Sequence, residues 1–460
     1  MAPFFLLAPI LLGYAVRAAS PTWISLNLSV PSTISDVEIN ANYVDVLVGT
    51  PPQVVQLPID LQTDAIDVYS SDCAFCPGWD FFDPSLSTTN KPNDRVLNGT
   101  NLFNGTWIYD TIGFGGIVES PDIDIGLLTV MSTNYTNFRI RNGGLGLLTN
   151  TFRKDPINRL IPRLYESGQL IDPVIGMRLD PSNPRLTIGA LDPNDYEGTL
   201  NWVELEPDNG DWFKYNVFKI DGFSGRNGSL LPFDDNLLTA VDSMYFDISI
   251  PNNLTYFNNT NYTGPVFSIN DTVDGYNLDP TFFQISYPCN TSSLFPNISV
   301  PHPYVDFSVH INGVSYMIDS DDNLLHQPSQ FSPNGFCNVG IVSTSDKITT
   351  EPQSVLGLPF LRSVYLAYRF PTGSCPGFFG FAFPKGLNRT QAQVSQTPRA
   401  TPTLSSQCLS LTRPTSTPIV SRPASPNSAS GNYAVYGEDG VQVSLSGADL
   451  LVKGIWNATF

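Results

Sequence analysis

The sequence predicts a mainly β protein made of two similar halves, and three observations carry this prediction. Helix-forming patterns are few along the 460 residues. Strand-forming segments alternate with turns that draw on 35 glycines and 39 prolines, which is typical of sheets joined by short loops. An apolar strand that ends in an aspartate occurs in each half of the chain, at Asp60 and at Asp242. The chain is long enough to bury one large core or two ordinary ones.

Composition and charge exclude several classes of protein. Hydrophobic residues make up 41% of the chain and charged residues 14%, a balance typical of a globular protein and not of a disordered one. The formal net charge of −19 argues against nucleic acid or an anionic membrane surface as a partner, because no basic stripe could neutralise phosphates. The acidity fits a protein that works in acidic surroundings, or one that charge keeps soluble.

The first residues and the glycosylation motifs predict export. Residues 4–16 form an apolar run that is too short to span a bilayer, and small residues follow at Ala18 and Ala19. We therefore expect a signal peptide over residues 1–18. Asn-x-Ser/Thr motifs recur along the chain, for example at Asn27 and Asn104. Together these features predict a secreted glycoprotein, either extracellular or associated with a cell wall.

Each aspartate follows a segment with strand character. Before Asp60, Gly49 and Pro51-Pro52 supply a turn, and the apolar residues of 54–59 suit a buried strand. Before Asp242, residues 237–241 form another apolar run, and Ser243 follows it. A weak internal repeat supports two related halves, since an apolar residue followed by glycine occurs at Leu145-Gly146 and at Leu356-Gly357.

These motifs resemble those of the pepsin-like aspartic proteases. The resemblance runs from about Tyr43 to Pro384 and includes Gly-Thr-Pro-Pro-Gln at 49–53, Cys73, and the segments 186–192, 196–198 and 355–362. It implies a mainly β, bilobal double-ψ β-barrel fold with a cleft between two lobes. It also implies that Asp60 and Asp242 are the catalytic carboxylates, which share one proton and hold a water between them.

The chain departs from the family's Asp-Thr-Gly motif at both aspartates. The first motif reads Asp60-Leu61-Gln62-Thr63, and the second reads Asp242-Ser243-Met244-Tyr245. Thr63 and Ser243 keep hydroxyls that the family uses around the site, so we expect them to contribute to substrate binding. Both glycines are replaced. If these positions need close backbone approach, Gln62 and Met244 displace the loops or fill the water site. A displacement of about 1 Å lowers a rate about a hundredfold.

The family spacing places Tyr109 at the position of the flap tyrosine that closes over substrate. The alternative is that Tyr109 is an ordinary aromatic residue of a strand. The surroundings of the three histidines match neither a serine elbow nor a metal-binding spacing, so we expect no serine triad, no metal and no cofactor.

The six cysteines predict disulfides in an exported protein. Cys73 and Cys76 could be a redox or zinc pair, but no second Cys-x-x-Cys and no nearby histidine accompany them, so a local disulfide is expected. The resemblance implies a second disulfide between Cys289 and Cys337. Cys375 and Cys408 remain, and they could pair with each other.

The chain divides into five parts by composition and motif. We expect the signal peptide at 1–18, an N-terminal lobe at 19–210, a C-terminal lobe at 211–385, a flexible Ser/Thr/Pro-rich stalk at 386–431 and a tail at 432–460. No transmembrane span is expected. A short helix is predicted from Leu160 to Gly168, with Leu160, Ile161, Leu164 and Tyr165 on one face and Gly168 ending it. Residues 20–41 contain no Lys or Arg, so a basic inhibitory pro-segment is not expected.

The sequence predicts a monomeric, secreted homologue of these proteases that binds an extended peptide or protein in its cleft and has impaired or no endopeptidase activity. The alternative is an active acid endopeptidase, in which a water held by Asp60 and Asp242 hydrolyses peptide bonds. A third possibility is a surface or wall-associated protein presented on its stalk.

Overall fold

The structure is a computed structural model of the chain, and it describes both predicted lobes in part. The described residues are 21–31, 42–76, 80–99, 103–131, 143–148, 159–206, 216–225, 230–232, 238–251, 277–279, 284–288, 307–319, 336–344, 352–400, 402, 408–411, 419–421, 433–436 and 442–445. The expected signal peptide at 1–18 lies outside the described residues. No helix among these ranges is long and apolar enough to cross a membrane.

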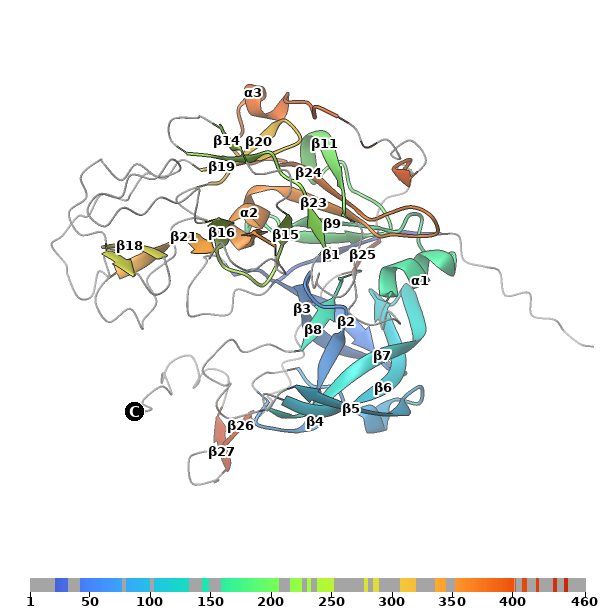
Figure 1. The fold of residues 1–460 in the computed structure, drawn as a ribbon. Helices are drawn as coiled ribbons and strands as arrows, with labels where there is room; N and C mark the ends of the chain where they lie inside the picture. Colours follow the sequence, from blue (N-terminus) through green and yellow to red (C-terminus); the bar gives the residue numbers. More distant parts are fainter. Residues whose placement is uncertain are drawn as a thin grey trace, which may run out of the picture.

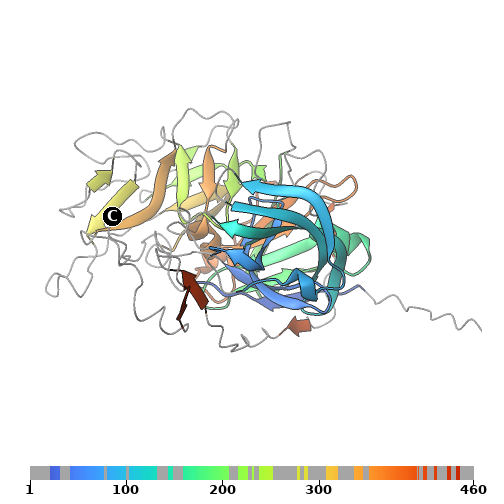
Figure 2. The same ribbon diagram turned by 90° about the horizontal axis from the view of Figure 1, so that it is seen from below.

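The first lobe is built on a seven-stranded sheet, which forms the lower body in Figure 1. A further pairing between the strands β2 and β6 closes this sheet into a barrel, and Figure 2 shows how strongly its cyan strands curve. Its strands, in spatial order, are β2 (Tyr43–Val48), β3 (Gln53–Asp60), β8 (Gly144–Gly146), β4 (Ile66–Ala74), β7 (Val118–Met131), β6 (Phe103–Phe114) and β5 (Lys91–Gly99). A short 3-10 helix, η1 (Pro84–Leu86), precedes β5.

The second lobe contains a seven-stranded and a four-stranded sheet. The helix α2 (Leu358–Ser363) follows the strand β22. The larger sheet has the order β12 (Val217–Phe218), β15 (Thr239–Val241), β22 (Ser354–Leu356), β16 (Ile248–Pro251), β21 (Phe336–Thr344), β18 (Gln284–Pro288) and β17 (Asn277–Asp279). The smaller has the order β14 (Leu230–Pro232), β13 (Gly222–Ser224), β19 (Ser308–Ile311) and β20 (Val314–Met317).

A third seven-stranded sheet draws strands from both halves of the chain and joins the lobes. Its order is β11 (Tyr196–Glu204), β24 (Phe378–Pro384), β23 (Tyr365–Arg369), β9 (Val174–Arg178), β10 (Arg185–Ile188), β1 (Ile24–Asn27) and β25 (Ile419–Ser421). One buried apolar cluster runs through all these sheets and includes Ile59 of the first lobe and Val241 of the second. The architecture confirms the predicted mainly β, bilobal fold.

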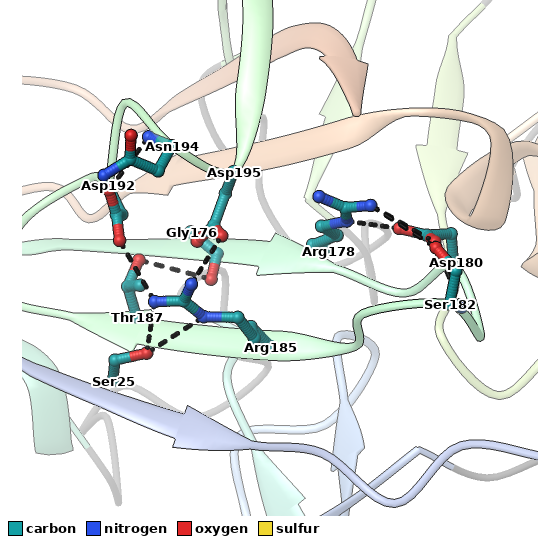
Figure 3. A network of polar contacts seen from close by, with 10 residues as sticks. All are labelled: Ser25, Gly176, Arg178, Asp180, Ser182, Arg185, Thr187, Asp192, Asn194 and Asp195. Atoms are coloured by element: carbon teal, nitrogen blue, oxygen red, sulfur yellow. Dashed lines mark hydrogen bonds and ion pairs between the residues drawn. The ribbon is translucent and has the colours of Figure 1, made fainter. Parts of the chain in front are cut away.

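A buried network of charged side chains lies on this shared sheet (Figure 3). The Arg185 guanidinium donates to Ser25 Oγ (2.8 Å) and pairs with Asp192 (3.0 Å) and Asp195 (3.1 Å). Burial raises the pKa of Asp195 to about 6, while the neighbouring Arg185 opposes this rise. The network ties β1 to the turn that follows β10, and sequence analysis did not find it.

The internal repeat predicted from sequence is present in the strand pairing. In the first lobe β3 pairs in parallel with β8, and β8 pairs antiparallel with β4. In the second lobe β15 pairs in parallel with β22, and β22 pairs antiparallel with β16. The two strands that lead to the aspartates therefore lie in equivalent places.

The predicted short helix is present as α1 (Leu160–Glu166), and Gly168 ends the turn after it with φ +76°. Leu160, Ile161 and Leu164 are buried, and Tyr165, expected on the same face, is 37% exposed. The helix has only 7 residues, about two turns, so its neighbours decide how far each side chain is covered.

The stretch expected as a flexible stalk is docked on the body over much of its first part. The helix α3 (Gln391–Val394) has a capping box at Thr390, and the Ala400 N–H donates to Asn312 Oδ1 (3.1 Å). A disulfide joins Cys408 to Cys375, and β25 pairs with β1. The expected stalk boundary at 386 is therefore too early, because composition does not reveal these specific bonds. Beyond β25, β26 (Tyr433–Tyr436) pairs with β27 (Gln442–Leu445).

Candidate active site

Asp60 is the last residue of β3, and it is 4% exposed. The parallel strand β8 lies beside it, in a register that sets Asp60 opposite Gly146. The Asp60 carbonyl accepts the N–H of Leu147 (2.8 Å). The last four residues of β3, Leu57 to Asp60, are all buried, so the strand ends with this carboxylate inside the protein.

Asp242 directly follows β15, and it is 5% exposed. Its N–H donates to the carbonyl of Leu356 (3.1 Å), and its own carbonyl accepts the N–H of Tyr245 (3.4 Å). Leu356 belongs to β22, which stands to β15 as β8 stands to β3. Both aspartates are therefore held by the same strand arrangement.

The two positions where the family has glycine keep their backbone contacts to the aspartates. The Gln62 N–H donates to Asp60 Oδ1 (2.8 Å), and the Met244 N–H donates to Asp242 Oδ1 (2.7 Å). Neither residue has a positive φ; the described non-glycine residues that do are Phe75, Asp122 and Asn312. The replacements therefore do not displace the loops, because the conformation needed here is open to any residue.

The side chains at these two positions differ in what they do. Gln62 Nε2 donates to Asp242 Oδ2, across the boundary between the lobes. Gln62 thus bonds one aspartate through its backbone and the other through its side chain. Met244 is 8% exposed and belongs to the buried apolar residues. The Gln62 side chain therefore contacts the second aspartate, whereas the Met244 side chain lies among apolar residues.

Ser243 links the two lobes through its hydroxyl. The Oγ donates to the carbonyl of Ile59 (2.7 Å) and accepts the N–H of Leu61 (3.2 Å). Ser243 is fully buried at 0% exposure, and its carbonyl accepts Asn42 Nδ2 (3.5 Å). The reciprocal contact from the first lobe would need a hydroxyl at 61, where the chain has a buried leucine. Of the two reciprocal hydroxyl contacts between the lobes, this chain therefore has the one made by Ser243.

Thr63 and Tyr109 are the other two predicted site residues, and they lie in different parts of the first lobe. The carbonyl of Thr63 accepts the N–H of Leu148 (2.9 Å), and a role for its hydroxyl stays a prediction. Tyr109 lies within β6, 36% exposed, near Thr111, whose carbonyl accepts the N–H of Gly49 (2.9 Å). That turn lies at the opposite end of the β2–β3 hairpin from Asp60, so the register does not bring Tyr109 to the aspartates. Its flap role stays a prediction.

The disulfides expected in the described part of the chain are present. Cys73 is joined to Cys76, and Cys375 to Cys408. Cys289 lies outside the described residues, so its pairing with Cys337 stays a prediction.

One polar pair outside the aspartate site was not found from sequence. Ser224 Oγ and His310 Nε2 are 2.7 Å apart on the neighbouring strands β13 and β19. Burial lowers the pKa of His310, and the nearby Asp221 opposes this. The Asp221 carboxylate accepts the N–H of Gly313 (2.6 Å) and pairs with Arg399 (3.5 Å). Because Asp221 is engaged there, it does not orient His310 as the third member of a triad.

The described ranges contain no group of three or more His, Cys, Asp and Glu residues that could hold a metal ion.

Comparison with known proteins agrees with the fold. The sequence profile described as "Eukaryotic aspartyl protease" matches residues 42–374. The chain is 23% identical over 351 residues to chymosin of Callithrix jacchus, covering 72% of this chain and 80% of chymosin. It is 23% identical over 372 residues to pepsin A of Canis lupus familiaris, covering 78% of this chain and 87% of the pepsin. It is 21% identical over 357 residues to renin of Canis lupus familiaris, covering 74% of this chain and 80% of the renin. The chain therefore belongs to the eukaryotic aspartyl protease family, among its pepsin-like members.

Proposed function

We propose that this chain is a peptide-binding member of the family with impaired or no endopeptidase activity. The observation that carries the proposal is the bond from Gln62 Nε2 to Asp242 Oδ2. Hydrolysis needs a water that both carboxylates hold, with one accepting its proton while the other polarises the scissile carbonyl. In this chain an amide takes up an oxygen that such a water would need.

The missing hydroxyl at residue 61 weakens the dyad further. Leu61 is buried in the apolar core, and its N–H donates to Ser243 Oγ, but its side chain has no hydroxyl to offer the opposite lobe. Catalysis depends on carboxylates held within a fraction of an ångström of the productive geometry. A dyad supported from one lobe only is expected to hold that geometry less well.

The peptide-binding part of the proposal rests on the parts of the fold that the motif changes leave intact. The lobes are built from sheets whose strands precede or follow the motif loops, and the shared sheet holds them together. A groove between two β lobes can bind an extended segment through main-chain hydrogen bonds. We propose such a peptide or protein segment as the partner of a monomeric, secreted and glycosylated chain. Asn27 and Asn104, both in glycosylation motifs, are exposed as attachment requires.

Cleavage of a denatured protein at about pH 3–5 tests the proposal, because a carboxylate dyad works at acid pH. Purified wild type and Asp60→Asn are compared, with a statine-type inhibitor as a control. Equal inactivity of two folded proteins is the expected result. Cleavage that the inhibitor blocks and the substitution abolishes would refute it.

An active acid endopeptidase is the second candidate, and the backbone hydrogen bonds to the two aspartates favour it. The N–H groups of Gln62 and Met244 donate to the aspartates at 2.8 and 2.7 Å, although neither residue is glycine. In this candidate the Gln62 amide leaves Asp242 when substrate binds. The cleavage assay separates the two candidates.

A further inference from the structure

We infer that Gln62 is an internal ligand of an otherwise preformed dyad, and that this one side chain blocks the site. The inference rests on the proposed function, since it names the residue that regulates the same site. It differs from a general decay of the motif, because it predicts that a single substitution reopens the position between Asp60 and Asp242.

The surroundings of the two aspartates are formed in equivalent ways. Each carboxylate accepts an N–H from the second residue after it, at 2.8 Å for Asp60 and at 2.7 Å for Asp242. Behind each loop stands a glycine without room for a side chain. A Cβ at Gly146 would lie 2.3 Å from the Ala65 carbonyl oxygen, and one at Gly357 would lie 2.2 Å from that of Asp247. Each loop is therefore held both by its N–H bond to the carboxylate and by close packing against a glycine.

The two replaced glycines differ in chemistry. Gln62 carries an amide, which can donate to a carboxylate, and its Nε2 does so at Asp242 Oδ2. Met244 carries a thioether, which has no donor, and it is counted among the buried apolar side chains at 8% exposure. Of these two residues, only Gln62 therefore contacts both carboxylates, and Met244 provides a matched comparison.

The hydrogen bond from Gln62 to Asp242 is strong enough to compete with water for the carboxylate. Asp242 accepts N–H groups at both oxygens, from Met244 at Oδ1 and from Gln62 at Oδ2. Hydrogen bonds to a charged carboxylate are stronger than those between neutral groups. The backbone of Gln62 is held at Asp60 through its own N–H, which places the side chain within reach of Asp242. A hydroxyl or water that enters between the carboxylates must first displace this amide.

The test measures what a hydroxyl placed between the carboxylates adds to binding. A statine-containing peptide and its deoxy analogue, which lacks only that hydroxyl, are titrated into full-length wild type, Gln62→Ala, Gln62→Met and Met244→Ala at one acid pH. In wild type we expect the two peptides to bind with about equal affinity. In Gln62→Ala we expect the hydroxyl to increase affinity about ten- to a hundredfold, the range of one hydrogen bond to a charged group.

The other two variants separate the causes. Gln62→Met keeps the length of the side chain without a donor, so an increase like that of Gln62→Ala assigns the block to the hydrogen bond. An increase in Gln62→Ala alone assigns it to the space that the side chain fills. Met244→Ala keeps the Gln62 amide, so it is expected to show no preference for the hydroxyl, whatever its effect on the affinity for both peptides. Equal affinities for both peptides in Gln62→Ala, or a hydroxyl preference already present in wild type, would overturn the inference.

Failure of the proposed function gives a different result. Binding of the deoxy peptide by wild type tests the cleft itself, independently of Gln62. If no variant binds either peptide, crystal structures of wild type and Gln62→Ala at the same pH decide the inference. An ordered water between Asp60 and Asp242 is expected in the variant only. A wild-type structure with Gln62 turned away from Asp242 would contradict it.

Discussion

Replacement of Ser243 by alanine should destabilise the protein strongly, because this hydroxyl connects the two lobes at the site. Ser243 Oγ donates to the carbonyl of Ile59 and accepts the N–H of Leu61, at 2.7 and 3.2 Å. Ile59, Leu61 and Ser243 are 0%, 1% and 0% exposed. Alanine would leave a carbonyl and an N–H of the first lobe without this partner, in a place that water cannot easily reach.

The magnitude follows from those two groups. A buried polar group that loses its partner costs about 1–3 kcal/mol, so Ser243→Ala should lower the free energy of unfolding by about 2–5 kcal/mol. The leucine at 61 cannot compensate, because it has no hydroxyl to offer the opposite lobe. The contact from Asn42 Nδ2 to the Ser243 carbonyl (3.5 Å) involves the backbone and should persist.

Equilibrium unfolding in urea measures this loss, provided that the dependence on urea concentration is unchanged. Ser395→Ala is the control, because its hydroxyl is exposed and contacts the Ala392 carbonyl at 3.4 Å. That variant should change stability by less than about 0.5 kcal/mol. A loss below about 1 kcal/mol for Ser243→Ala would show that the hydroxyl does not hold the lobes together.

Three further predictions concern other parts of the fold. Asp195 has a pKa raised by burial from 3.8 to about 6, so stability that is present at acid pH is lost as the pH rises to about 6. In Asp195→Asn, the free energy of unfolding in urea should lose this pH dependence, which is roughly 1–3 kcal/mol between pH 4 and 7. A pH profile equal to that of wild type would contradict this. Gly146→Ala should lower the free energy of unfolding by about 3 kcal/mol or prevent folding, because its Cβ would lie 2.3 and 2.6 Å from two carbonyl oxygens. Gly144→Ala is the matched control, because a Cβ there would have no atom within 4 Å. Cys408→Ser opens a disulfide to Cys375 that spans 33 residues and should cost about 2–4 kcal/mol in thermal unfolding; an equal melting temperature would show that the docked segment contributes nothing.

The sequence was informative where structure depends on neighbouring residues. The turn at Gly49, the apolar run before Asp60 and the glycine of the repeat at Gly146 are local features, and the structure has each in its expected place. They suffice because alternation and turn chemistry act over a few residues. The two aspartates were found in this way, since each marks the end of a recognisable strand.

Predictions failed where a side chain chooses its partner far along the chain. The docking of the segment after 386 depends on Asn312 and on a disulfide to Cys375, and a composition rich in Ser, Thr and Pro gives no sign of either. The 37% exposure of Tyr165 on α1 is equally beyond the sequence, because the helix is only 7 residues long and its neighbours decide which side chains they cover.

The sequence by itself determined the family and the bilobal β fold and predicted the aspartate pair, because these follow from local patterns in a fixed order. It also showed that both motif glycines are replaced, but not with what effect. Only the tertiary structure decided that the backbone at Gln62 and Met244 keeps its bonds, and that the Gln62 amide reaches Asp242. The reason is physical: a glutamine side chain has several rotamers of similar energy, and the partner that selects one of them lies 180 residues away.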